Sequence, residues 1–124
     1  MKIVVCDDSK AMRMIVTRML HGSGFADAEI IEAADGAEGL QAVADHAPDL
    51  VLSDWNMPNL TGIEFLQQLR ARGDQTTFGF VTSESTPKMR QLAIRHGAAF
   101  TLAKPFNATQ FAEVVGGVAA RGGI

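Results

Sequence analysis

Residues 50–58 read Leu-Val-Leu-Ser-Asp-Trp-Asn-Met-Pro, and this stretch decides the fold class. Its first four residues, from Leu50 to Ser53, form a short apolar run without alternation, which is typical of a strand buried on both faces of a parallel sheet. Asp54 follows the run directly. In open α/β sheets, ligands bind beyond the carboxyl ends of the strands, so the position of Asp54 predicts a functional acid.

Similar apolar runs lie on both sides of this stretch, at Ile3 to Cys6, Ala28 to Ala33, Phe78 to Val81 and Ala99 to Ala103. Segments with apolar residues at helical spacing separate the runs and follow the last one. Strands and helices that alternate in this way are joined by right-handed crossovers. The sequence therefore predicts an α/β fold, a doubly wound, five-stranded parallel sheet with five helices.

The five helical segments each carry apolar residues three and four positions apart, which predicts one buried face per helix. Ser9 and Asp35 are expected to cap the first two helices. Gly116 and Gly117 predict that the last helix ends early or frays, because each glycine costs about 1 kcal/mol relative to alanine. The expected inner faces are Met12, Ile15, Val16 and Met19; Ala37, Leu40, Val43 and Ala44; Gly62, Phe65, Leu66 and Leu69; Met89, Leu92 and Ala93; and Phe111, Ala112 and Val115.

The chain has 124 residues, enough for one compact domain, and we expect residues 1–124 to form it. A net charge of −3 does not fit direct nucleic-acid binding, and no apolar stretch approaches the roughly 20 residues of a transmembrane helix. The first residues do not fit a signal peptide, so we expect a mature N-terminus and a cytoplasmic location. Cys6, the only cysteine, is expected to be a small buried hydrophobe.

Polar residues follow four of the five expected strands: Asp7 and Asp8, Asp54, Thr82 and Lys104. Crowded carboxylates raise each other's pKa values unless a cation neutralises them, and oxygen ligands suit Mg²⁺. A lysine and a hydroxyl suit phosphoryl oxygens, and an aspartate can accept a phosphoryl group. Each residue alone has a simpler explanation, because the acids can cap the first helix, Lys104 can be a solvated loop residue and Thr82 a turn residue.

Four motifs, taken together, resemble those of one family, the response-regulator receiver domains of two-component systems, and especially the single-domain, CheY-like regulators. The resemblance spans almost the whole chain. It implies the strand order 2-1-3-4-5 for the sheet. The motifs are Val4 to Ser9, Leu50 to Pro58 with Gly62, Val81 to Ser83, and Lys104 to Phe106.

The resemblance also implies a role for each site residue. Asp54 is the expected phosphoacceptor, supplied by a phosphohistidine on a sensor histidine kinase or a histidine phosphotransfer domain. Asp7, Asp8 and Asp54, with the backbone carbonyl of Asn56, are the expected Mg²⁺ ligands. Thr82 and Lys104 are expected to contact the phosphoryl oxygens, and the Lys104-Pro105 peptide is expected to be cis.

Further residues are expected to tune the site or the switch, namely Trp55, Ser83, Glu84, Thr101 and Pro105. Asn56 and Glu84 follow the chemotaxis pattern that is associated with self-dephosphorylation, which implies a short-lived signal. Thr101 is a departure, since many receivers carry an aromatic residue there. Its neighbour Phe100 points to the opposite side of the strand, so we expect Phe100 to be core or interface filler. The output face is expected on the fourth helix, fifth strand and fifth helix.

Three functions compete. The leading one is a phosphorylation-activated regulator, in chemotaxis or motility by resemblance, that binds an output protein and is not an enzyme beyond its own phosphorylation and dephosphorylation. A phosphorelay intermediate or phosphate sink would carry the same residues. A haloacid-dehalogenase-type phosphatase would also use a strand-end aspartate, but it needs a general acid where this chain has Asn56.

Overall fold

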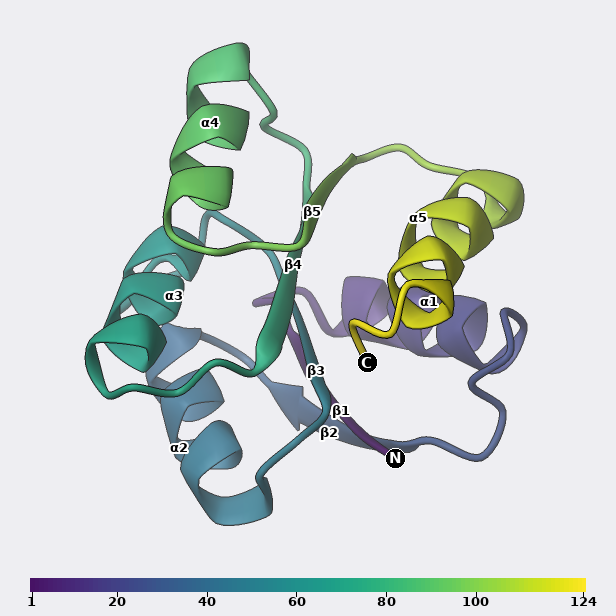
Figure 1. Ribbon diagram of the computed structural model, residues 1–124, viewed down its shortest axis with the longest axis horizontal. Coiled ribbons are helices and arrows are strands. Elements are labelled where there is room, and N and C mark those ends of the chain that lie inside the picture. Colours follow the sequence, from purple (N-terminus) through teal and green to yellow (C-terminus); the bar gives the residue numbers. More distant parts are fainter.

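Five parallel strands form the sheet of the computed structural model, which describes residues 1–124, and they pair in the order β2-β1-β3-β4-β5. The predicted fold class and strand order are confirmed (Figure 1). The elements are β1 Lys2–Cys6, α1 Lys10–His21, β2 Glu29–Ala33, α2 Gly36–His46, β3 Leu50–Ser53, α3 Gly62–Ala71, β4 Thr77–Thr82, α4 Pro87–Arg95, β5 Phe100–Ala103 and α5 Ala108–Ala120.

Two helical layers enclose the sheet, with α1 and α5 on one face and α2, α3 and α4 on the other (Figure 1). The core on the α2–α4 face contains 16 buried residues, among them Phe65, Phe78 and Phe80. The core on the α1–α5 face is smaller, with 11 buried residues that include Leu20 and Phe111. Since both faces are covered, the central strands β1 and β3 carry the uninterrupted apolar runs from which the fold was predicted.

Two predicted helix faces are partly wrong. In α2, Ala37 and Ala44 are exposed, and the buried stripe instead runs through Gly36, Gly39, Leu40, Ala42 and Val43. Apolar periodicity missed the glycines, which are buried because α2 packs closely on its neighbour: a Cβ on Gly39 would lie 2.6 Å from the Phe65 ring. In α1, Ile15 is 40% exposed, whereas Val16 and Leu20 are buried.

The predicted early end of the last helix is also wrong, because α5 continues through Gly116 and Gly117 to Ala120. Val115 and Val118 are buried on either side of the glycines, so tertiary packing outweighs their low helix propensity. Beyond the helix, the Gly123 amide donates to the Val118 carbonyl at 2.9 Å. None of the helices combines the length and apolar character that a membrane crossing requires.

Candidate functional site

Asp7 and Asp54 lie side by side at the carboxyl ends of β1 and β3. The register pairs Cys6 with Ser53, the last residues of the two strands. The Asp54 amide donates to the Cys6 carbonyl at 2.9 Å, and the Asp7 amide donates to the Ala33 carbonyl at 3.0 Å, so the ladder continues one residue beyond each strand. Both acids are buried, with 5% of Asp7 and 9% of Asp54 exposed. The sheet therefore fixes the backbone of both residues.

Asp8 completes a cluster of three carboxylates. One oxygen from each of Asp7, Asp8 and Asp54 lies within 4.8 Å of the others. The acids do not cap α1, because Ser9 does so: its hydroxyl accepts from the Met12 amide at 3.2 Å. Three hard oxygen ligands at this separation fit a divalent cation such as Mg²⁺.

Lys104 reaches the cluster from the end of β5. Its Nζ lies 3.0 Å from Asp7 Oδ2 and 3.6 Å from Asp54 Oδ2. The Lys104 amide donates to the Thr82 carbonyl at 2.8 Å, which ties the residue to the end of β4, and the Lys104-Pro105 peptide is cis, as predicted. Only 15% of the Lys104 side chain is exposed, so it is not a solvated loop lysine.

Burial raises the pKa of Asp54 above the ordinary value of an aspartate. The Lys104 ammonium opposes this rise in pKa, the charge of Asp7 adds to it, and the Trp55 amide and the Thr82 hydroxyl lower it. The Trp55 amide donates to Asp54 Oδ1 at 2.7 Å. One lysine thus only partly compensates two neighbouring acids, which leaves room for a further positive charge.

The other predicted residues surround the cluster at different depths. Thr82 is 1% exposed, and its hydroxyl accepts from the Glu84 amide at 3.2 Å. Trp55 is buried against Phe80, with ring centroids 4.8 Å apart. Asn56, Ser83, Glu84 and Pro105 are exposed.

Thr101 and Phe100 lie on opposite faces of β5. Thr101 is half-buried and pairs in register with Phe80, a residue of the α2–α4 core. Phe100 packs against the α1–α5 core, where its ring covers the place that a side chain on Gly79 would take. Phe100 was expected to fill the core or an interface, and it packs on the core; no aromatic residue stands at the Thr101 position.

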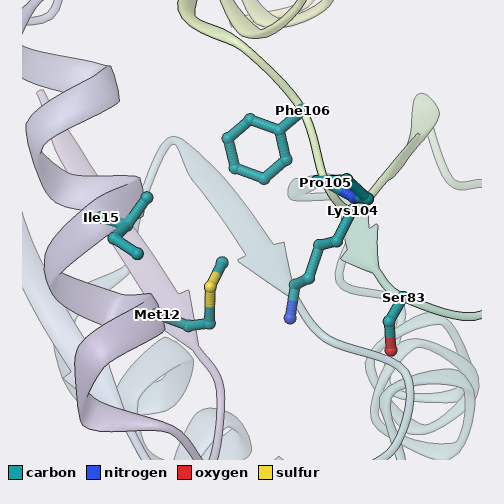
Figure 2. Close-up of a pocket in the computed structure, with 6 residues that line it drawn as sticks. All are labelled: Met12, Ile15, Ser83, Lys104, Pro105 and Phe106. Carbon is teal, nitrogen blue, oxygen red and sulfur yellow. The ribbon is translucent and has the colours of Figure 1, made fainter.

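An apolar pocket of about 330 Å³ adjoins the cluster, between α1 and the loop after β5. Figure 2 shows the Lys104 side chain running along one wall, with Met12 and Ile15 across from it and Phe106 above. The ring centroids of Phe106 and Phe111 are 5.6 Å apart, so the wall rests on α5. Met12, Ile15 and Phe106 had no predicted site role, although Phe106 is the last residue of the Lys104 to Phe106 motif.

Arg13 also contacts the site, and its role was not predicted from sequence. Its guanidinium donates to the Asp7 carbonyl at 2.6 Å and forms an ion pair with Glu32 at 2.8 Å. The available signal in the sequence was an arginine about one turn into α1 that could form an ion pair with an acid on β2. This contact links the start of the cluster to β2.

Residues 3–116 match the family model of the response regulator receiver domain, and the chain belongs to this family. Receiver domains are signalling proteins rather than classical enzymes. The fold is thus that of a CheY-like signalling domain.

Three similar proteins illustrate the range of this family. A protein of Rhizobium etli named as a chemotaxis protein CheY is 34% identical over 107 residues, which are 85% of this chain and 81% of that protein. The response regulator MprA of a Mycobacterium species is 35% identical over 105 residues, but the match covers 44% of its length, so this chain spans less than half of that relative. The structure of the chemotaxis protein CheY4 of Vibrio cholerae is 33% identical with a TM-score of 0.83, over 94% of this chain and 97% of that one.

Proposed function

We propose that this protein is a phosphorylation-activated response regulator in which Asp54 accepts a phosphoryl group from a phosphohistidine, in a Mg²⁺-dependent reaction. The observation that carries the proposal is the place of the Lys104 ammonium, 3.0 Å from Asp7 and 3.6 Å from Asp54. One cation between two buried carboxylates is an arrangement suited to an incoming anionic group. We further propose residues 1–124 as one receiver domain, because α5 continues to Ala120 and Ile124 packs on the core.

In the proposed transfer, an Asp54 carboxylate oxygen forms a bond to phosphorus. The bond from phosphorus to the histidine nitrogen breaks, and its electron pair returns to the imidazole. Lys104 and the Thr82 hydroxyl bind the phosphoryl oxygens, since both groups donate and both face the Asp54 carboxylate. Asp7, Asp8, Asp54 and the Asn56 carbonyl would hold Mg²⁺, which supplies positive charge against the phosphoryl oxygens.

The phosphodonor is proposed to be a sensor histidine kinase or a histidine phosphotransfer domain. The apolar pocket beside Lys104 supports this, because a docked protein needs an apolar contact that leaves the donor histidine at the site (Figure 2). Asn56 and Glu84 are proposed to tune attack by water on the acyl phosphate, and both are exposed two residues beyond Asp54 and Thr82. A cytoplasmic location remains part of the proposal.

The output surface is proposed on α4, β5 and α5. Ile94 in α4 is 66% exposed, the largest exposure among the large apolar side chains, and α4 carries no acidic residue. Likeness to the chemotaxis proteins named above supports a role in chemotaxis or motility.

Fluorescence of Trp55, the only tryptophan, tests the proposal directly. Mg²⁺ is added first, then a small-molecule phosphodonor, and intact mass is followed in parallel. We expect a fluorescence change with Mg²⁺ and a gain of one phosphoryl group that disappears in Asp54→Asn. The matched control is Asp27→Asn, which removes an exposed acid that is not part of the carboxylate cluster. This variant should behave like the wild-type protein. If the wild-type protein gains no phosphoryl group in intact mass, the proposal is refuted.

The same sample separates an effector from a relay. Protein that carries a labelled phosphoryl group on Asp54 is mixed with a histidine phosphotransfer domain, and the distribution of the label is followed over time. Loss of label to inorganic phosphate alone supports the effector role, whereas label on the histidine domain supports the phosphorelay alternative.

A further inference from the structure

The loop between β3 and α3, residues 54–61, is fastened to the start of α2 by two hydrogen bonds. The Asn59 side-chain amide donates to Asp35 Oδ2 at 2.6 Å, and the Gly36 amide donates to the Leu60 carbonyl at 3.2 Å. The other Asp35 oxygen, Oδ1, accepts from the Glu38 amide at 2.8 Å and caps α2. A single carboxylate therefore holds both the helix and the loop.

Asn59 fits this contact through its backbone as well as its side chain. Its φ is +67°, in the left-handed region, where asparagine is favoured over most other residues. This backbone conformation directs the Asn59 side chain toward Asp35. The hydrogen bond to Asp35 then stabilises the same backbone conformation. The contact joins residues 24 positions apart, so it links two elements that the chain alone does not bring together.

The space between the loop and α2 is closed. A Cβ on Gly36 would lie 2.6 Å from the Leu60 carbonyl oxygen. Cys6 fills the gap nearest the sheet, where its Sγ lies 3.1 Å from the Asp35 carbonyl and 3.5 Å from Met57 Sδ. The end of β1, the start of α2 and the loop thus pack as one unit.

Asn56, in the middle of this loop, is exposed and has no hydrogen-bond partner within residues 1–124. Its position is set only by its neighbours along the chain. On one side, the Trp55 carbonyl accepts from the Gly62 amide at 2.7 Å. On the other side, the anchors are Met57 and the Asp35–Asn59 bond.

We propose that Asp35 and Asn59 are positioning residues that set the place of the Asn56 carbonyl and thereby the Mg²⁺ affinity of the site. The inference rests on the function proposed above. Neither residue belongs to the carboxylate cluster, so each acts through the loop rather than on the metal. When groups that orient the ligands of a metal without touching it are removed, the metal affinity falls by about 10- to 100-fold.

Two variants remove the bond and keep the local structure. Asn59→Gly retains a backbone that adopts positive φ without strain. Asp35→Ser retains a hydroxyl that can cap α2, but one short hydroxyl cannot also hold Asn59. The matched control is Asp74→Ser, which removes a carboxylate that accepts from the Thr76 amide at 2.8 Å in the loop before β4, at the opposite end of the sheet.

Mg²⁺ titration followed by Trp55 fluorescence, with thermal unfolding in parallel, gives the decisive readout. We expect Asn59→Gly and Asp35→Ser each to raise the Mg²⁺ Kd about tenfold. The double variant should be no weaker than the weaker single variant, because the two residues act through one bond. At saturating Mg²⁺, the phosphorylation rate should return to that of the unmodified protein. Asp74→Ser should lower the Tm and leave the Kd unchanged.

The outcomes separate the inference from the proposed function. If the unmodified protein does not respond to Mg²⁺, the proposed function fails and takes the inference with it. If the wild-type protein responds, but both variants bind Mg²⁺ with the same Kd as the wild-type protein, only the positioning role is overturned. A rate that stays low at saturating Mg²⁺ also overturns it, since the residues then serve the fold and not the ligand.

Discussion

The two halves of the edge that carries the site are held very differently. On the β1–β3 half, every residue from Ile3 to Cys6 and from Leu50 to Ser53 is at most 1% exposed, and the loop after β3 is fastened to α2. On the β4–β5 half, β4 is buried from Phe78 to Thr82, but in the edge strand β5 only Leu102 is buried, and Ser83 and Glu84 after β4 are exposed. The free energy of a local conformational change is smallest where few buried contacts must break. The rigid half therefore suits metal binding, and the looser half suits a response to phosphorylation.

The largest expected effect is that of Gly62→Ala on the rigid half. A Cβ on Gly62 would collide with the Asp54 carbonyl oxygen and lie 2.9 Å from the Phe80 ring. Neither neighbour can yield, because one is backbone beside the site and the other is in the core. We expect the free energy of unfolding, measured by urea denaturation, to fall by about 3 kcal/mol. An unchanged urea midpoint would show that the rigid half yields more easily than its packing indicates.

Lys104→Met tests the side chain that reaches from the end of β5 to the acids of the rigid half. Without the ammonium, the carboxylates of Asp7 and Asp54 face each other uncompensated, and we expect the metal-free protein to lose about 2 kcal/mol of stability. The same change removes a charge that repels Mg²⁺, so Mg²⁺ should bind about tenfold more tightly, a gain of about 1.4 kcal/mol. Urea denaturation with and without Mg²⁺ measures both effects. Weaker Mg²⁺ binding would contradict the compensating role of Lys104.

The strand-end residues of both halves were predictable from sequence, whereas the contacts that fasten the rigid half were not. Strand-end position alone brought Asp7, Asp54 and Lys104 together, because parallel strands end on one edge of a sheet. The bond between Asp35 and Asn59 could not be predicted in this way, since it joins a helix cap to a loop residue whose left-handed backbone leaves no pattern in the sequence. Spacing of apolar residues likewise missed the buried glycines of α2, whose close packing depends on Phe65, a residue of the next helix.

Acid should loosen the rigid half through Asp35. The Glu38 amide and the Asn59 side chain lower the pKa of Asp35 from its ordinary value of 3.8. A lowered folded-state pKa contributes stability that is fully present above the unfolded value and is lost as the pH falls through the folded value. We therefore expect the stability difference between the unmodified protein and Asp35→Asn to be constant near pH 7 and to shrink below about pH 4.

Urea denaturation of both proteins at several pH values measures this difference. It should be smaller than the two effects above, because asparagine still caps α2. A difference that is independent of pH down to pH 3 would mean that the Asp35 charge contributes nothing to the loop contact.

The smallest expected effect lies outside both halves, in α5, where Gly116→Ala should stabilise the protein. Gly116 is in the interior of α5, its φ is not positive, and a Cβ there would meet no atom within 4 Å. Alanine in such a place restricts the unfolded chain and adds no strain, so we expect a gain of about 0.5 to 1 kcal/mol and a Tm higher by about 3 °C. Gly117→Ala is the matched control, since its Cβ would lie 3.2 Å from Arg121 Nη1 and should gain less. Because α5 is remote from the carboxylates, the Mg²⁺ Kd should not change in either variant. A loss of stability in Gly116→Ala would mean that α5 does not tolerate a Cβ even where no atom lies within 4 Å of its place.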